Sequence, residues 1–151
     1  MATGDIIFFD EALDTAFFGG WATTDAVKLA ILDNTVTPTA ATATPTLATT
    51  FTTGEVTAAG TYTAGGTALA ENWGALSVEA AGTLTFDSAT NPTWAQNASN
   101  ATDAWWGLLY NSTQAGQPAF AYVELGGPVD MTAGSLTVTW NATGIFTIAK
   151  A

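Results

Sequence analysis

Short apolar runs alternate with Gly, Asn, Asp and Pro at close spacing from residue 54 onward. This pattern is typical of an all-β domain whose strands are joined by short turns. Leu136, Val138 and Trp140 alternate with Ser and Thr, which predicts a strand with one buried face. Residues 141–144 then predict a hairpin loop, with Ile145–Ile148 as the returning strand.

Two further segments, 105–110 and 120–125, are apolar on both faces apart from Glu124. Such runs indicate central strands or strands buried at an interface. Nearer the start of the chain, Asp25–Asp33 carries alternating apolar residues and predicts another strand. In all, the pattern predicts about eight strands, arranged as a β-sandwich or jelly roll.

The first part of the chain has a different pattern. Apolar residues at helical spacing predict a short helix around Asp10–Phe18, which ends at a pair of glycines. Ile6–Phe9 alone is also compatible with a strand. We therefore expect an N-terminal arm and short helix over residues 1–24, followed by a β-sandwich domain over 25–151.

Residues 34–53 are dominated by Thr, Ala and Pro. This composition predicts an extended loop with little helix. The segment is either a surface loop or an arm that grasps a partner, and the sequence leaves both interpretations open.

Composition restricts the function. The chain has no Arg, His or Cys, only two Lys, and thirteen carboxylates, for a formal charge of −11. Binding to nucleic acid or to an anionic membrane needs basic residues, so neither partner is expected. Without His, the sequence offers no recognisable nucleophilic triad, and without His and Cys zinc lacks its usual ligands. No carboxylate pair has distinctive spacing. We expect a protein that is not an enzyme, with no catalytic residues, no cofactor and no bound metal.

The tryptophans are open to three interpretations. Trp105 and Trp106 are adjacent, so in a strand they point to opposite sides. Tryptophans of a β-domain fill its core, anchor a protein interface or stack on sugar rings as in carbohydrate-binding modules. The first interpretation is favoured, and the other two remain open.

The order of motifs resembles small virion proteins of tailed bacteriophages. The motifs are Val27–Leu32, Gly54–Gly66, Gly82–Thr90 with Trp94, Trp106–Asn111, and the pair Gly134–Asn141 and Gly144–Ile148. Together they cover most of residues 10–148. The chain departs from these proteins in having no Arg after the Gly-Tyr motif, where Thr61 also separates Gly60 from Tyr62.

The resemblance implies a non-enzymatic structural protein of the virion, most specifically a capsid decoration or cement protein. Such a protein is made in the bacterial host cytoplasm, sits on the capsid surface and binds the major capsid protein or other virion proteins. It also implies a homo-oligomer, for which a trimer is the expectation. A tail, neck or fibre protein and a carbohydrate-binding module are the alternatives. The expected interface residues are Ile6, Phe8, Phe9, Phe51, Trp105 and Trp106.

Overall fold

The computed structural model describes residues 3–12, 14, 20–22, 24–72, 77–80 and 83–149. These residues form antiparallel sheets, as the all-β expectation required, with ten strands where about eight were expected. Most of the predicted helix at Asp10–Phe18 lies outside the described residues. The strands are β1 Ile6–Phe8, β2 Ala26–Leu32, β3 Thr67–Asn72, β4 Ser77–Ala80, β5 Thr83–Phe86, β6 Thr93–Trp94, β7 Ala104–Asn111, β8 Ala119–Val129, β9 Leu136–Thr137 and β10 Phe146–Ala149.

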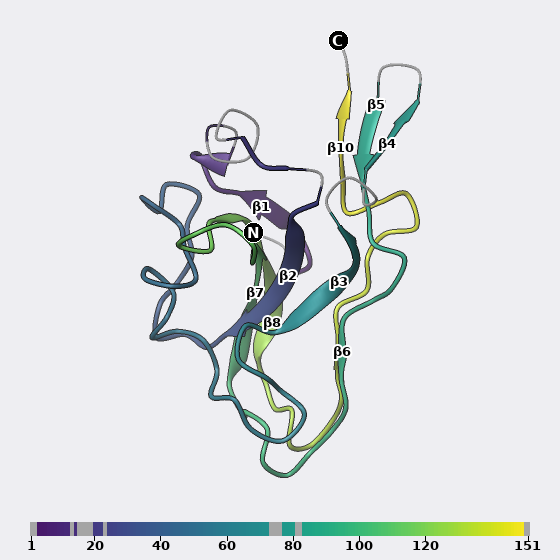
Figure 1. Ribbon diagram of the computed structural model, residues 1–151. Coiled ribbons are helices and arrows are strands. Elements are labelled where there is room, and N and C mark those ends of the chain that lie inside the picture. The colour runs from purple at the N-terminus through teal and green to yellow at the C-terminus, as the bar shows by residue number, and fades with distance from the viewer. Residues whose placement is uncertain are drawn as a thin grey trace.

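A five-stranded sheet with the order β1-β8-β7-β2-β3 forms the body of the protein (Figure 1). The sequence prediction for residues 105–110 is confirmed, because β7 is the middle strand and is almost entirely buried. β2 and β8 flank β7 over six paired residues each. Both faces of these strands are covered by other parts of the chain, which explains why their sequences are continuously apolar rather than alternating.

A bulge in β8 distributes its aromatic residues between the two faces of the sheet. Leu109 pairs with Ala121 and Tyr110 pairs with Ala119, so Phe120 is an extra residue between them. The Phe120 ring therefore contacts Phe86 and Phe146, while Tyr122, two residues later, packs against Phe9 on the opposite face. The bulge allows one short segment to supply large side chains to both core layers.

The second structural unit is a long, interrupted ribbon, in which β5 and β6 run antiparallel to β10 and β9 (Figure 1). β4 pairs with the other edge of β5, so the ribbon has three strands at that end. The predicted hairpin of residues 136–148 is wrong, because Ile145–Ile148 does not return along the strand that precedes it. The turn itself exists, since the Gly144 amide donates to the Asn141 carbonyl over 2.9 Å. However, the edge of residues 136–140 is already occupied by residues 91–94, and β10 pairs with β5 instead. The turn is thus a bulge within the ribbon.

The Thr/Ala/Pro-rich segment 34–53 contains turns and is packed onto the sheet. Leu47 and Phe51 are buried in the core, and the Leu47 amide donates to the Gln117 carbonyl over 3.0 Å. The Ala119 amide in turn donates to the Pro45 carbonyl over 2.7 Å. The segment therefore covers one face of the five-stranded sheet, and its apolar residues are turned inward.

Candidate protein-binding groove

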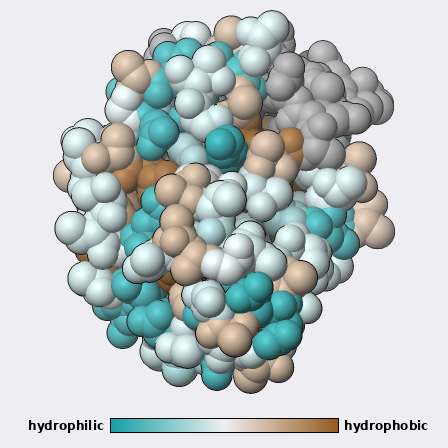
Figure 2. Space-filling model, turned by 60° about the horizontal axis from the view of Figure 1, so that its bottom comes forward, coloured by the Kyte–Doolittle hydropathy of each residue, from teal (hydrophilic) through white to brown (hydrophobic). Residues whose placement is uncertain are grey.

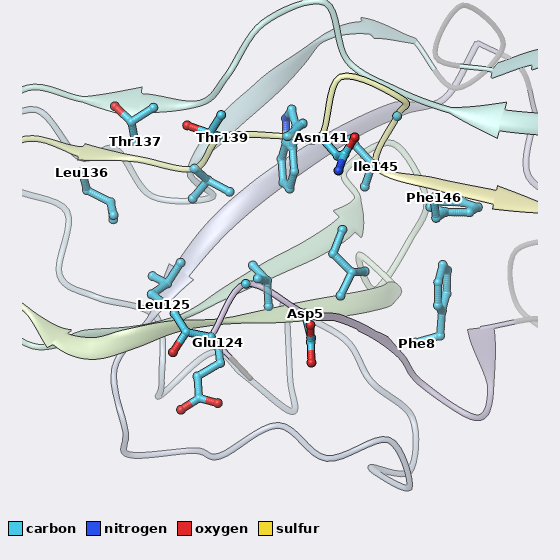
Figure 3. A pocket seen from close by; sticks show the side chains of 17 residues that line it. Asp5, Phe8, Glu124, Leu125, Leu136, Thr137, Thr139, Asn141, Ile145 and Phe146 are labelled. Atoms are coloured by element: carbon cyan, nitrogen blue, oxygen red, sulfur yellow. The ribbon is translucent and has the colours of Figure 1, made fainter. Parts of the chain in front are cut away.

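A groove of about 620 Å³ lies between the β1–β8 side of the large sheet and the ribbon residues 136–146 (Figure 3). The two layers diverge here, except at one end where Phe8 contacts Phe146. The lining combines apolar side chains from both walls with polar residues, which are threonines and Asn141 along the ribbon and Asp5 and Glu124 along the sheet. The main apolar contributors are Ile6, Phe8, Leu125, Leu136, Val138 and Phe146.

An aromatic cluster closes one end of the groove. Phe146 of β10 stacks on Phe86 at 4.9 Å between ring centroids, and Phe8 meets Phe146 edge-on at 4.8 Å. Phe8 also lies 6.3 Å from Phe120. Even with these contacts Phe8 keeps 37% of its surface accessible, and it is the only exposed large apolar residue among those whose side-chain burial the structure describes. Phe8 and the apolar side chains of the groove together form a contiguous accessible surface, a feature that marks protein interaction sites.

The backbone of β1 has a free side at this groove. β1 is an edge strand, paired in the described part of the chain with β8 alone. The Phe9 amide donates to the Phe120 carbonyl over 3.0 Å, and the register continues through Ile7 opposite Tyr122. In an antiparallel ladder the hydrogen-bonding residues alternate, so the amide and carbonyl groups of Ile6 and Phe8 point away from β8. These groups are a template for an additional strand.

Two carboxylates lie beside the same edge, on the opposite face of the sheet. Asp5 precedes β1 and Glu124 lies in β8, one residue beyond the partner of Ile6. Figure 3 shows both carboxylates pointing away from the ribbon. The edge of the sheet therefore has Ile6 and Phe8 on the side toward the ribbon, and the two carboxylates together with Ile7 on the side away from it.

The expected interface residues divide into two groups. Ile6 and Phe8 line the groove, and Trp105 is half-buried in β7. Phe9, Phe51 and Trp106 lie in the core of the single chain.

Sequence reasoning missed the ribbon wall of the groove. Val138 and Trp140 were recognised as the apolar face of a strand, but their partner layer was not identified. The indole N–H of Trp140 is buried and has no acceptor among the described residues, and buried donors of this kind are uncommon. No sequence signal indicates that the two layers diverge at this point.

The tryptophans give no support to a sugar platform. Trp94 and Trp106 are buried, while Trp21, Trp105 and Trp140 are partly buried against the core. Trp73 lies outside the described residues. None of these five indoles is an exposed side chain, whereas stacking on a sugar ring requires an accessible ring face.

The Gly54–Gly66 motif forms an internal polar cluster. Tyr62 accepts a hydrogen bond from the Ile31 amide over 3.1 Å and donates to Glu55 over 2.8 Å. Tyr110 donates to the Gly65 carbonyl over 2.8 Å. Burial raises the pKa of Tyr62 strongly, and burial together with the Glu55 charge raises the pKa of Tyr110 to about 12. The cluster holds this segment against the sheet, a structural role.

A second polar cluster joins the end of β7 to the start of β2. Asp25, which is 3% exposed, accepts hydrogen bonds from Asn111 over 2.8 Å and Gln114 over 2.9 Å. The Ala22 amide donates to the same oxygen over 3.1 Å. Burial alone would raise the pKa of Asp25, but these three donors outweigh it and lower the pKa below its usual value. Through its Oδ2 atom, which accepts all three hydrogen bonds, this buried carboxylate holds two strand ends together.

Other kinds of site are not apparent in the part of the chain that the structure describes. Its His, Cys, Asp and Glu residues form no group of three or more that could hold a metal ion. None of its helices combines the length and apolarity needed to cross a membrane. No protein-family model, no curated protein and no solved structure matches the chain. The groove beside β1 is therefore the best candidate for a functional site.

Proposed function

We propose that this chain is a non-enzymatic structural protein of a tailed-phage virion, most specifically a capsid decoration protein that binds and stabilises the outer shell. The observation that carries the proposal is the apolar groove, flanked by an open sheet edge and by Phe8. The order of sequence motifs supplies the virion context. Within this proposal, the large sheet facing the ribbon corresponds to the sandwich or jelly-roll arrangement expected from the sequence.

The surface chemistry supports attachment through protein contacts. Charged residues make up only 10% of the chain, and nearly all are acidic. Figure 2 shows one face of the molecule, where weakly polar residues predominate and strongly apolar ones are largely confined to recesses. A net charge of −11 keeps such a protein away from packaged nucleic acid, whose phosphates it would repel.

The mechanism is stabilisation by mass action. A protein that binds the assembled shell but not its separated subunits shifts the equilibrium toward the shell. Symmetric sites on a capsid favour symmetric oligomers, and a trimer remains our proposal. Binding of a trimer at a threefold position would link neighbouring capsid subunits without any covalent step.

Immunogold labelling of purified particles, with antibodies raised against this chain, tests the proposal. A decoration protein gives gold over the whole head, and its removal lowers the temperature at which the head releases DNA. Gold at the neck, the tail or the fibres would instead assign the protein to that part of the virion. Particles without gold, together with absence of the chain from their protein profile, would refute a virion role.

A further inference from the structure

We propose that the groove receives an extended segment of a basic protein partner, which pairs with the free edge of β1 as a sixth strand of the large sheet. The inference rests on the proposed function in treating this groove as the surface that contacts the shell. It adds the conformation and the residue pattern of the bound segment.

The backbone argument comes from the register of β1. Ile6 and Phe8 direct their amide and carbonyl groups away from β8, whereas Ile7 pairs with Tyr122 and the Phe9 amide donates to the Phe120 carbonyl. One added strand would satisfy two donors and two acceptors of β1. Extended peptides bind many proteins by adding to a sheet edge in this manner, with backbone bonds giving affinity and side-chain pockets giving specificity.

The side-chain argument comes from the two different sides of this edge. On the ribbon side, Ile6 and Phe8 face Val138, Ile145 and Phe146 across the groove. Alternate residues of an added strand would enter that gap, so they should be apolar. The remaining residues would lie on the side where Asp5 and Glu124 direct their carboxylates (Figure 3).

Those remaining residues should be basic. A cross-strand neighbour of Asp5 lies within reach of its carboxylate, and opposite charges at such positions stabilise strand pairing. The overall charge of −11 also favours the approach of a positively charged partner. The bound segment is therefore expected to alternate apolar residues with Lys or Arg.

A second copy of this chain is a poorer occupant of the edge. Pairing β1 with its own copy would bring together two acidic segments from chains of charge −11 each. Like charges facing each other across strands are destabilising. Electrostatics therefore favour pairing of β1 with a basic partner over pairing of β1 with a second copy of this chain.

The direct test is amide hydrogen exchange by NMR on the full chain, with and without a capped six-residue peptide that alternates Lys and Val. In the free protein the Ile6 and Phe8 amides should exchange at least about tenfold faster than the Ile7 and Phe9 amides. A saturating amount of peptide should slow the Ile6 and Phe8 amides by at least about tenfold, because they become bonded.

Three control peptides isolate the pattern. A peptide of the same composition with its lysines in one block keeps the charge but loses the alternation, and should bind at least about tenfold more weakly. A Glu/Val peptide reverses the charge, and a Lys/Val peptide methylated at alternate backbone nitrogens removes the strand donors. Both should fail to protect β1. Equal binding of the alternating and blocked peptides would mean that charge attraction alone is involved, and would overturn the proposal.

Two protein variants complete the test. Ile6→Pro removes an outward-facing donor while leaving the β1–β8 bonds intact, and edge strands tolerate proline. Ile6→Ala is its matched control, since it shortens the side chain but keeps the amide. The proline variant should lose peptide binding beyond the alanine variant, and equal losses would refute strand addition. Protection of Ile6 and Phe8 that rises with protein concentration alone would instead identify a second copy as the occupant.

The outcomes for this inference and for the proposed function are distinguishable. If gold labels the head but the alternating peptide gives no protection, the decoration function stands and strand addition at β1 fails. If the peptide protects β1 but purified particles lack the protein, the groove binds basic strands in another setting and the virion role fails.

Discussion

Truncating Phe51 should unfold the protein far more readily than truncating Phe8, although both were expected at an interface. Phe51 is 0% exposed and its ring lies 5.8 Å from that of Phe9. Replacement of a fully buried phenylalanine by alanine removes its transfer free energy and leaves a cavity, for a loss of about 3–5 kcal/mol. For a chain of this size, that loss lowers the Tm by about 6–20 °C.

The matched control is Phe8→Ala. Phe8 is 37% exposed, so its truncation should cost only about 1–2 kcal/mol. Urea unfolding followed by tryptophan fluorescence gives both values, provided that the slope of the transition is unchanged. If Phe51→Ala costs no more than Phe8→Ala, the segment 34–53 does not pack on the sheet, and the interpretation of Phe51 as a core residue is refuted.

Four other outcomes follow from the structure. Burial raises the pKa of all three tyrosines, Tyr110 to about 12, so folded protein at pH 10 should show less phenolate absorbance at 295 nm than protein in guanidinium, which should titrate near pH 10. Because folding raises these pKa values, the stabilisation that the tyrosines contribute is fully present below about pH 10 and is lost as the pH rises through the folded-state values. A folded sample whose tyrosines ionise at pH 10 as they do in guanidinium would contradict their burial. Gly66→Ala should lower the free energy of unfolding by more than about 3 kcal/mol, because φ is +69° and the new methyl group would strike the Leu29 carbonyl. The control Gly116→Ala, at φ +80° in open space, should lower it by only about 1–2 kcal/mol. Similar losses in thermal unfolding would refute the close approach of Gly66 to Leu29. Because the pKa of Asp25 is lowered by folding, its ionised carboxylate stabilises the fold above about pH 4, and this stabilisation is lost as the pH falls through the folded-state pKa. Asp25→Asn should therefore be less stable than the parent protein at pH 7 but should lose less stability between pH 6 and pH 3. If the variant responds to acid as the parent does, Asp25 does not have this role. If the protein decorates a capsid mainly through apolar and backbone contacts, it should stay on purified heads in about 1 M salt, where exposed ion pairs are screened; complete release under these conditions would indicate a predominantly ionic attachment.

The strands were predictable where burial left a clear pattern. Residues 105–110 are continuously apolar because β7 lies in the middle of the sheet, and Leu136 and Val138 are buried while Thr137 and Thr139 are exposed, as their alternation required. The pairing of β10 was not predictable, because a turn at 141–144 is equally compatible with a hairpin and with a bulge. Contacts between Phe146 and Phe86, sixty residues apart in the chain, decide between them.

The groove could be predicted only in part. Ile6 and Phe8 were identified from their apolar character near the start of the chain, and both line it. Phe9 has the same character, yet the alternation of the strand turns it into the core. Whether an apolar residue is covered depends on how closely two layers approach each other, and that separation is set by distant segments such as the ribbon.

The pairing of strands also has a consequence for how the chain acquires its structure. β1 pairs with β8, β2 with β7 and β5 with β10, so three of the seven strand pairs in the described part of the chain join segments separated by sixty residues or more. Proteins rich in such non-local pairing fold slowly, on a scale of about milliseconds to seconds, because the chain loses the entropy of closing a long loop before the stabilising contacts form. During synthesis β1 leaves the ribosome long before its partner β8, so its apolar side chains stay exposed to solvent until β8 has been made. A requirement for chaperone assistance, or misassembly when production is fast, is the expected consequence in the cell.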